Sequence, residues 1–175
     1  MYICNHQSFL DPILMSLGLC RPMNYMTRDS LFRNPLFGRV IRSFNAFPVR
    51  RHTADLAAMK EAMRRLKAGG QVVVFAEGTR TTDGRVGPML PGVALLAQRA
   101  AQWTVPVAID GAFEAWPRTQ PLPSPGFISV SYGRPIPREQ AADMEPHELM
   151  RRVRATIIDL QADLRRRTCR PALKY

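Results

Sequence analysis

The chain has 175 residues, of which 46% are hydrophobic and 22% are charged. These proportions are typical of a globular protein with a buried core, and they exclude a disordered, collagen-like or disulfide-stapled chain. A chain of this length predicts one domain, over residues 1–175. The 25 Lys and Arg outweigh the 14 Asp and Glu and give a formal net charge of +11. So basic a chain predicts an anionic partner: nucleic acid, acidic lipid, a phosphorylated substrate or an acidic carrier protein.

The cysteine spacing and the hydropathy pattern exclude further classes of protein. Cys4, Cys20 and Cys169 are widely spaced and form no CxxC pair, which argues against a zinc module or disulfide framework and fits a reducing compartment. No apolar run approaches the roughly 18–20 residues that span a bilayer. The start of the chain, MYICNHQSFLDP, lacks the basic and apolar regions of a signal peptide.

Apolar runs and turn signals predict strands that alternate with helices. The first part of the chain predicts a strand over 2–4, a turn over 5–8, a helix up to residue 19 and a mixed stretch over 23–51, which includes a turn at Asn34-Pro35 and an edge strand over 44–49. Next we expect a helix between Thr53 as N-cap and Gly69-Gly70 as stop, a strand over 71–75, a polar loop over 81–88 and a helix over 91–101. The last part predicts a strand over 105–109, a Pro-rich loop over 117–126, a strand over 127–132 and a helix over 146–167. This alternation predicts an α/β fold with a mostly parallel sheet flanked by helices.

Polar clusters follow two of the expected strands, and ligands of such sheets bind beyond the carboxyl ends of the strands. In the first cluster, His6 lies in the turn and Asp11 at the start of the following helix, where Ser8 or Asp11 is the expected cap. On one continuous helix, residues five apart would point about 140° away from each other. The strand–turn–helix arrangement instead lets Asp11 hold one ring nitrogen and leaves the other nitrogen as a base.

The second cluster is Glu77-Gly78-Thr79-Arg80, at the end of the strand over 71–75. Gly78 allows a tight turn, Thr79 offers a hydroxyl, Arg80 a phosphate fork and Glu77 an acceptor for a substrate hydroxyl. Taken alone, each cluster also fits an ordinary polar turn or helix start. Arg50-Arg51, after a short apolar segment, fits either an anion clamp or a solvated charge pair. Cys4 and His6 share a face of the first strand and suggest a rival thiol nucleophile, although same-face neighbours lie about 6.5–7 Å apart.

Four segments in order are more specific than any one of them: Asn5-His6 with Asp11, an arginine after FPV, FAEGTR over 75–80 and VPVAI over 105–109. Together they resemble the PlsC-type glycerolipid acyltransferases, which include the 1-acyl-glycerol-3-phosphate (lysophosphatidate) acyltransferases. AWPR, PLPSPG and YGRPI are similar to the closing region of that family. The resemblance implies its glycerol-phosphate acyltransferase-like fold.

The resemblance also implies site roles, which we carry over position by position. His6 and Asp11 fall on the catalytic motif N-H-x-x-x-x-D. The expected substrate-binding residues are Ser8, Arg50, Arg51, Glu77, Gly78, Thr79 and Arg80. In the second motif, G-x-x-F-I-x-R, Asn45 replaces the glycine and Pro48 the aromatic residue, so either Arg50 or Arg51 takes the place of the family's arginine. In the third motif Ala76 replaces a proline.

The implied reaction moves a fatty acyl group from a thioester, acyl-CoA or acyl carrier protein, to the free hydroxyl of a lysophospholipid. Lysophosphatidate, giving phosphatidate in phospholipid biosynthesis, is the default acceptor. The resemblance implies no metal and no cofactor beyond the acyl co-substrate. Family members usually carry a hydrophobic or helical segment before the first motif, but here Met1 lies four residues before Asn5. We therefore expect a truncated or replaced front.

The basic charge suits an anionic membrane surface, and we expect peripheral attachment at the cytoplasmic face of a membrane without a transmembrane segment. The expected contact is the basic side of the last helix, where the arginines are Arg151, Arg152, Arg154, Arg165, Arg166 and Arg167; a solvated outer face is the alternative. A weakly active or inactive lipid-binding relative is a second interpretation. A nucleic-acid-binding module is disfavoured, because aromatic residues are only 8% and fall largely in apolar segments.

Overall fold

The structure, a computed structural model, describes residues 1–17, 19, 21–50 and 55–175. The strands are β1 (Tyr2–Cys4), β2 (Met23–Arg28), β3 (Ala46–Val49), β4 (Gln71–Phe75), β5 (Trp103–Asp110), β6 (Ser129–Tyr132) and β7 (Ile136–Pro137). The helices are α1 (Asp11–Leu17), α2 (Pro35–Ser43), α3 (Leu56–Lys67), α4 (Ala94–Arg99), α5 (Ala112–Ala115), α6 (Arg138–Ala142) and α7 (Pro146–Arg167), with 3-10 turns at Asp29–Phe32 and Pro91–Val93.

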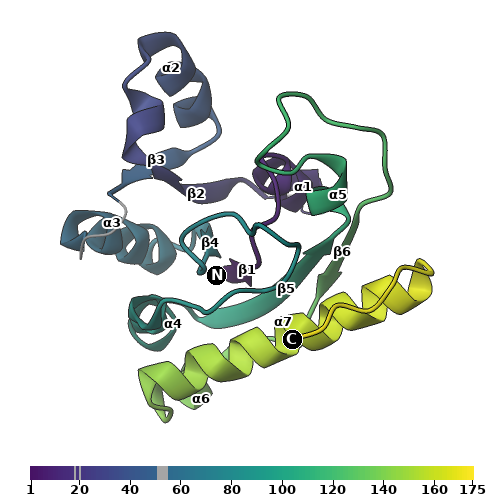
Figure 1. Ribbon diagram of the computed structural model, residues 1–175. Coiled ribbons are helices and arrows are strands. Elements are labelled where there is room, and N and C mark those ends of the chain that lie inside the picture. The colour runs from purple at the N-terminus through teal and green to yellow at the C-terminus, as the bar shows by residue number, and fades with distance from the viewer. Residues whose placement is uncertain (18, 20, 51–54) are drawn as a thin grey trace.

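Six strands form the main path of the sheet in the order β3-β2-β4-β1-β5-β6 (Figure 1). Strands β1 to β5 run parallel, whereas β6 and the short β7 pair with β5 in the antiparallel sense. This confirms the expected α/β class with a mostly parallel sheet. The five parallel strands end at one edge, where loops from different parts of the chain meet.

Helices cover both faces of the sheet, as expected when parallel strands are apolar on both sides. Neighbouring residues of a strand alternate between two apolar clusters; Ile3 belongs to one and Cys4 to the other. The cluster of Ile3 includes buried side chains of α3, α4 and α7, and the cluster of Cys4 includes Met15 of α1. Figure 1 shows α7 crossing the sheet beside β5.

Local sequence signals located several elements within a residue or two. β4 covers the apolar run over 71–75, and α7 covers 146–167 as expected. α3 ends before Gly69, whose φ of +79° is the left-handed conformation that glycine adopts easily. Its N-cap is Asp55, whose side chain accepts a hydrogen bond from the Ala58 amide. The expected cap Thr53 lies outside the described residues, and so does Cys20.

The stretch over 23–51, which the sequence left mixed, contains more order than expected. β2 lies between β3 and β4 in the sheet. α2 begins after Asn34, whose side chain accepts a hydrogen bond from the Phe37 amide, with Pro35 in the first turn. The Asn34-Pro35 signal therefore marks a helix start as well as a turn.

The arginines of α7 do not form the continuous exposed stripe that the sequence suggested. Arg165 is buried and pairs with Asp110 and Glu114 at 2.8 and 3.1 Å. Arg154 points to the loop before α4 and donates to the carbonyls of Val86 and Gly87. Both guanidinium groups therefore contribute contacts that hold the fold together.

Candidate active site

Strand pairing brings the two polar clusters together. β1 and β4 are parallel neighbours, and Cys4 is opposite Phe75 in their register. His6 and Glu77 each come two residues after this pair, so both lie at the carboxyl edge of the sheet. The backbone amide of His6 donates to Glu77 Oε1 at 2.9 Å, which joins the clusters directly.

The His6 ring contacts the Asp11 carboxylate as the strand–turn–helix arrangement predicted. His6 Nδ1 lies 2.7 Å from Asp11 Oδ2, and Asp11 is fully buried. An ionised carboxylate can only accept, so Nδ1 carries the proton and Nε2 of the neutral ring is the acceptor. Nε2 has no hydrogen-bond partner among the described residues. The ring stacks on Phe75 with centroids 4.3 Å apart, which fixes its plane.

Asp11 also holds the shape of the turn. Its Oδ2 accepts from the backbone amides of Gln7 and Ser8, at 2.6 and 2.8 Å, in addition to the His6 ring. One buried side chain therefore orients the base and folds the segment that carries it.

Glu77 supports the same turn from β4. Its Oε2 accepts from the Gly87 amide at 2.9 Å, while Oε1 accepts from His6. Burial raises the pKa of Glu77 to about 7; the Asp11 charge adds to the rise, while the His6 and Gly87 amides and Arg154 oppose it. Both carboxylate oxygens are engaged by backbone amides, so in this structure Glu77 braces the site.

We expect the contribution of Glu77 to stability to fall as the pH rises from about 4.5 to 7. With its pKa raised, the folded protein binds more protons than the unfolded chain across this interval, so deprotonation favours unfolding. The free energy of unfolding of the wild type, relative to Glu77→Gln, should decrease by about 2 kcal/mol between pH 5 and 8. Urea titrations of both proteins at each pH measure this difference. Glu139→Gln, an exposed change on α6, is the control. A difference between wild type and Glu77→Gln that stays constant with pH would show that burial does not raise the pKa of Glu77.

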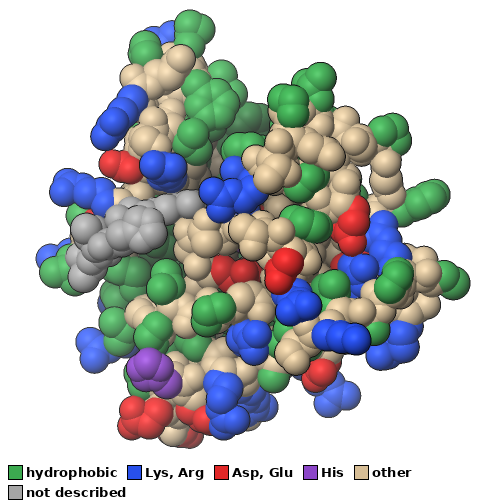
Figure 2. Space-filling view, in the orientation of Figure 1, with side chains coloured by type: hydrophobic (Ala, Val, Ile, Leu, Met, Phe, Trp, Pro, Cys, Tyr) green, Lys and Arg blue, Asp and Glu red, His purple; other side chains and the backbone are tan. Residues whose placement is uncertain are grey.

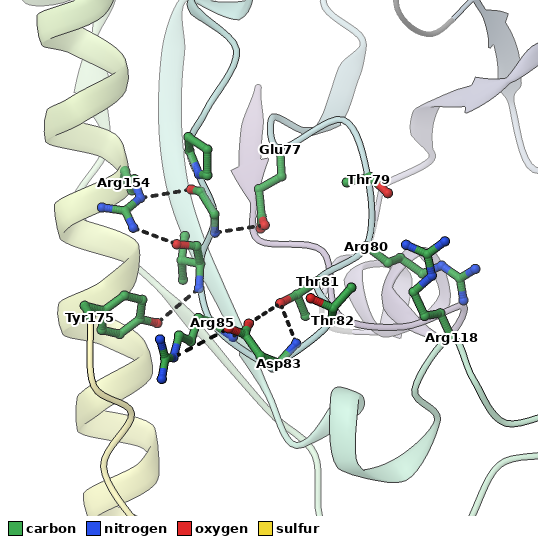
Figure 3. Close-up of a pocket in the computed structure, with 13 residues that line it drawn as sticks. Glu77, Thr79, Arg80, Thr81, Thr82, Asp83, Arg85, Arg118, Arg154 and Tyr175 are labelled. Atoms are coloured by element: carbon green, nitrogen blue, oxygen red, sulfur yellow. Dashed lines mark hydrogen bonds and ion pairs between the residues drawn. The ribbon is translucent and has the colours of Figure 1, made fainter.

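A cavity of about 440 Å³ opens beside Glu77 (Figure 3). This volume lies in the range of small-molecule sites. The lining residues are Glu77, Thr79, Arg80, Thr81, Thr82, Asp83, Arg85, Val86, Gly87, Pro88, Arg118, Arg154 and Tyr175. Four arginines against two acids make the lining basic. His6 is not among the lining residues, and Glu77 connects the cavity to the turn of His6.

Some of the expected substrate-binding residues line the cavity, and others shape the turns beside it. Thr79 and Arg80 line the cavity, and the Arg80 guanidinium carbon lies 3.6 Å above the Phe9 ring centroid. Gly78 has a φ of +72°, which provides the tight turn expected of it. Ser8 is buried, and its hydroxyl donates to the Trp116 carbonyl, so it ties the turn to α5.

The two arginines of the second motif remain unassigned. Arg50 follows β3 and is exposed, and its backbone amide donates to Asp55. Arg51 lies outside the described residues. The binding of substrate phosphate by either arginine stays a prediction.

Cys4 is unsuited to the rival nucleophile role. Its thiol is fully buried and contacts the Met15 sulfur at 3.2 Å. Burial raises its pKa well above the ordinary value, and the Asp11 and Glu77 charges add to the rise. Because the thiolate is the reactive form, Cys4 is a core residue.

Sequence reasoning missed the residues that hold the loop over 83–88. Arg154 donates to two carbonyls of this loop, and the Tyr175 hydroxyl accepts from the Val86 amide and donates to Gln161. These residues follow the third motif by about 75 positions or more. No local pattern connects them to it, so a three-dimensional structure was needed to find them.

Comparison with known proteins identifies the family of this chain. Residues 1–110 match the family model described as Acyltransferase. The chain belongs to the Acyltransferase family. This confirms the sequence-based recognition, since the matched span contains both polar clusters.

Individual relatives of the family carry more specific names. The chain is 30% identical over 139 residues, 78% of its length, to the chloroplastic 1-acyl-sn-glycerol-3-phosphate acyltransferase BAT2 of Brassica napus, and 27% identical over 146 residues, 83% of its length, to the 1-acyl-sn-glycerol-3-phosphate acyltransferase of Bacillus subtilis. It spans 40% of the Brassica protein and 70% of the Bacillus protein. The crystal structure of the 1-acyl-sn-glycerophosphate acyltransferase PlsC from Thermotoga maritima superposes with a TM-score of 0.74 at 26% identity, over 92% of this chain and 66% of that one. The expected fold is therefore confirmed.

Proposed function

We propose that this chain transfers a fatty acyl group from a thioester, acyl-CoA or acyl carrier protein, to the free hydroxyl of 1-acyl-glycerol-3-phosphate and so forms phosphatidate. The observation that carries the proposal is the 2.7 Å contact between His6 Nδ1 and Asp11 Oδ2, which directs Nε2 outward as a base. Family membership and the names of the relatives supply the reaction class.

In the proposed step, His6 Nε2 removes the proton of the acceptor hydroxyl while that oxygen attacks the thioester carbonyl. The tetrahedral intermediate collapses to an ester, the carbon–sulfur bond breaks, and the leaving thiolate takes a proton from the imidazolium. Asp11 stabilises the imidazolium between these two transfers. The route needs no acyl-enzyme, because a thiolate is a competent leaving group, and it needs no metal or further cofactor.

The basic cavity is the proposed site of the acceptor phosphate. Arg80, Arg85 and Arg118 line it from two loops, and guanidinium groups form forked hydrogen bonds with phosphate oxygens. Phosphate bound there lies next to Glu77, which contacts the turn of His6. Thr79, Gly78 and Ser8 remain proposed contributors to the shape of this site, and Arg50 or Arg51 a second proposed phosphate contact.

We further propose that the protein works peripherally at the cytoplasmic face of a membrane, where its lipid acceptor resides, in phospholipid biosynthesis. Across the described residues, none of the helices is long and apolar enough to cross a bilayer. The excess of basic residues suits anionic lipid surfaces. Nucleic acid is not a proposed partner.

The direct test is lipid mass spectrometry of purified protein with a panel of acceptors. Lysophosphatidate should yield phosphatidate with acyl-CoA or acyl carrier protein as donor, whereas lysophosphatidylcholine, whose phosphate carries a choline, should react at least tenfold more slowly. The physical reason is that a phosphate monoester presents more charge and more free oxygens to the arginines. Product from neither donor with any acceptor would overturn the proposal.

A further inference from the structure

Helix α2 (Pro35–Ser43) exposes a row of large apolar side chains. Leu36 and Phe37 in its first turn, Val40 in its middle and Phe44 at its C-cap are all exposed, and Leu31 lies exposed just before it. Figure 1 shows the helix standing away from the sheet beyond the edge formed by β2 and β3. Proteins rarely expose such a group of neighbouring apolar side chains unless the group takes part in binding.

Basic residues outnumber acidic residues around this apolar row. Between Asp29 and Asp55 the sequence contains five arginines and no Asp or Glu. Arg33, Arg39 and Arg42 are exposed beside the apolar residues, and Figure 2 shows green and blue side chains together over α2 at the upper left. On α7, by contrast, Arg151 pairs with Glu148 and Arg167 with Asp163.

The apolar row begins at the edge of the sheet where the candidate active site lies. β2 is parallel to β4 and leads from its carboxyl end through a 3-10 turn into α2, so the first turn of α2, with Leu36 and Phe37, follows from this edge, whereas Phe44 precedes the start of β3. Other exposed apolar side chains at this edge are Phe9, in the turn after β1, and Leu122 and Phe127, between β5 and the start of β6. A surface in contact with this edge would lie close to His6.

We propose that α2 docks on an anionic lipid bilayer, with Leu36, Phe37, Val40 and Phe44 inserted among the acyl chains and Arg33, Arg39 and Arg42 against the headgroups. Amphipathic helices bind membranes in this way, through buried apolar area and attraction to anionic lipid. A second copy of the chain is a poorer occupant, because two such faces would bring arginine against arginine. The choice of a lipid bilayer as the partner rests on the proposed function. The proposal assigns the membrane contact to α2 in preference to α7.

Vesicle flotation with phosphatidylglycerol/phosphatidylcholine liposomes tests the proposal. Leu36→Ser/Phe37→Ser should lower the partition coefficient tenfold or more, since full burial of one such side chain is worth at least that factor. Leu56→Ser is the matched control, because Leu56 on α3 is 69% exposed and Leu36 is 70% exposed; it should bind like wild type. Arg33→Gln/Arg39→Gln should lower binding about fivefold per charge on the anionic vesicles and little on pure phosphatidylcholine.

Three results would overturn docking through α2. One is equal flotation of Leu36→Ser/Phe37→Ser and wild type. Another is loss of binding in Arg151→Gln/Arg152→Gln, which alters α7. The third is a wild-type dimer that Leu36→Ser/Phe37→Ser converts to a monomer with lipid binding unchanged.

The proposed enzymatic function is tested separately, with lysophosphatidate dispersed in detergent micelles. If docking is right and the function wrong, the α2 variants lose flotation while wild type forms no phosphatidate. If the function is right and docking wrong, wild type forms phosphatidate while flotation is the same for every variant. Circular dichroism of each variant checks that the fold is retained.

Discussion

Replacement of His6 by alanine is expected to lower kcat for acyl transfer by about 10²–10⁴-fold, the usual value of a positioned proton transfer. The physical reason is that Nε2 is the base that the Asp11 contact leaves available. Stability should change little, because the hydrogen bonds that hold the turn do not involve the His6 side chain. The His6 backbone bonds to Glu77 and to the Thr81 amide, and Asp11 accepts from the turn amides. The measurement is steady-state kinetics together with a thermal melt.

His147→Ala provides the matched control for His6→Ala, since His147 is exposed on α7. It should retain wild-type kcat. If His6→Ala forms phosphatidate at the wild-type rate with a correctly folded protein, the proposed mechanism is wrong. Equal losses in both variants would point to a general effect on the fold.

Asp11→Asn is the second change expected to have a large effect, a loss of kcat of about 10²–10⁴-fold. The amide oxygen can take the place of Oδ2 and accept from the Gln7 and Ser8 amides, so the turn persists. The amide carries no charge, however, and cannot stabilise the imidazolium that forms when His6 takes the proton. KM for lysophosphatidate should change much less than kcat.

Two further variants separate the catalytic role of Asp11 from its structural role. Asp11→Ala should also lose stability, because it leaves two buried amides without an acceptor, at about 1–3 kcal/mol each. His6→Ala/Asp11→Asn should be no slower than His6→Ala alone, since the two groups act as one unit. Additive losses in the double variant would contradict the proposed coupling.

The periodicity of single segments predicted much of the fold. β4 and α7 were located from apolar runs and spacing, because both are strongly patterned and end at clear signals such as Gly69. β2 and α2 were missed for a physical reason. β2 mixes polar and apolar residues, and α2 exposes the apolar residues that normally indicate a buried face.

The sequence predicted the contact of His6 with Asp11 but not the connections of the rest of the candidate site. Local chain geometry was enough to bring His6 to Asp11, which are five positions apart. The adjacency of β1 and β4 is a matter of strand order, which one sequence does not encode locally. The brace formed by Glu77 with Gly87 depends on this adjacency. The sequence pattern instead assigns Glu77 to a substrate hydroxyl, a role that stays a prediction.

The contacts of Arg154 and Tyr175 with the loop over 83–88 bear on protein engineering. The family match ends at residue 110, yet the amide that bonds Glu77 belongs to a loop anchored from α7 and from the segment after it. A fragment cut at that boundary would retain all four motifs and lose their anchorage. The smallest piece worth expressing therefore continues through Tyr175.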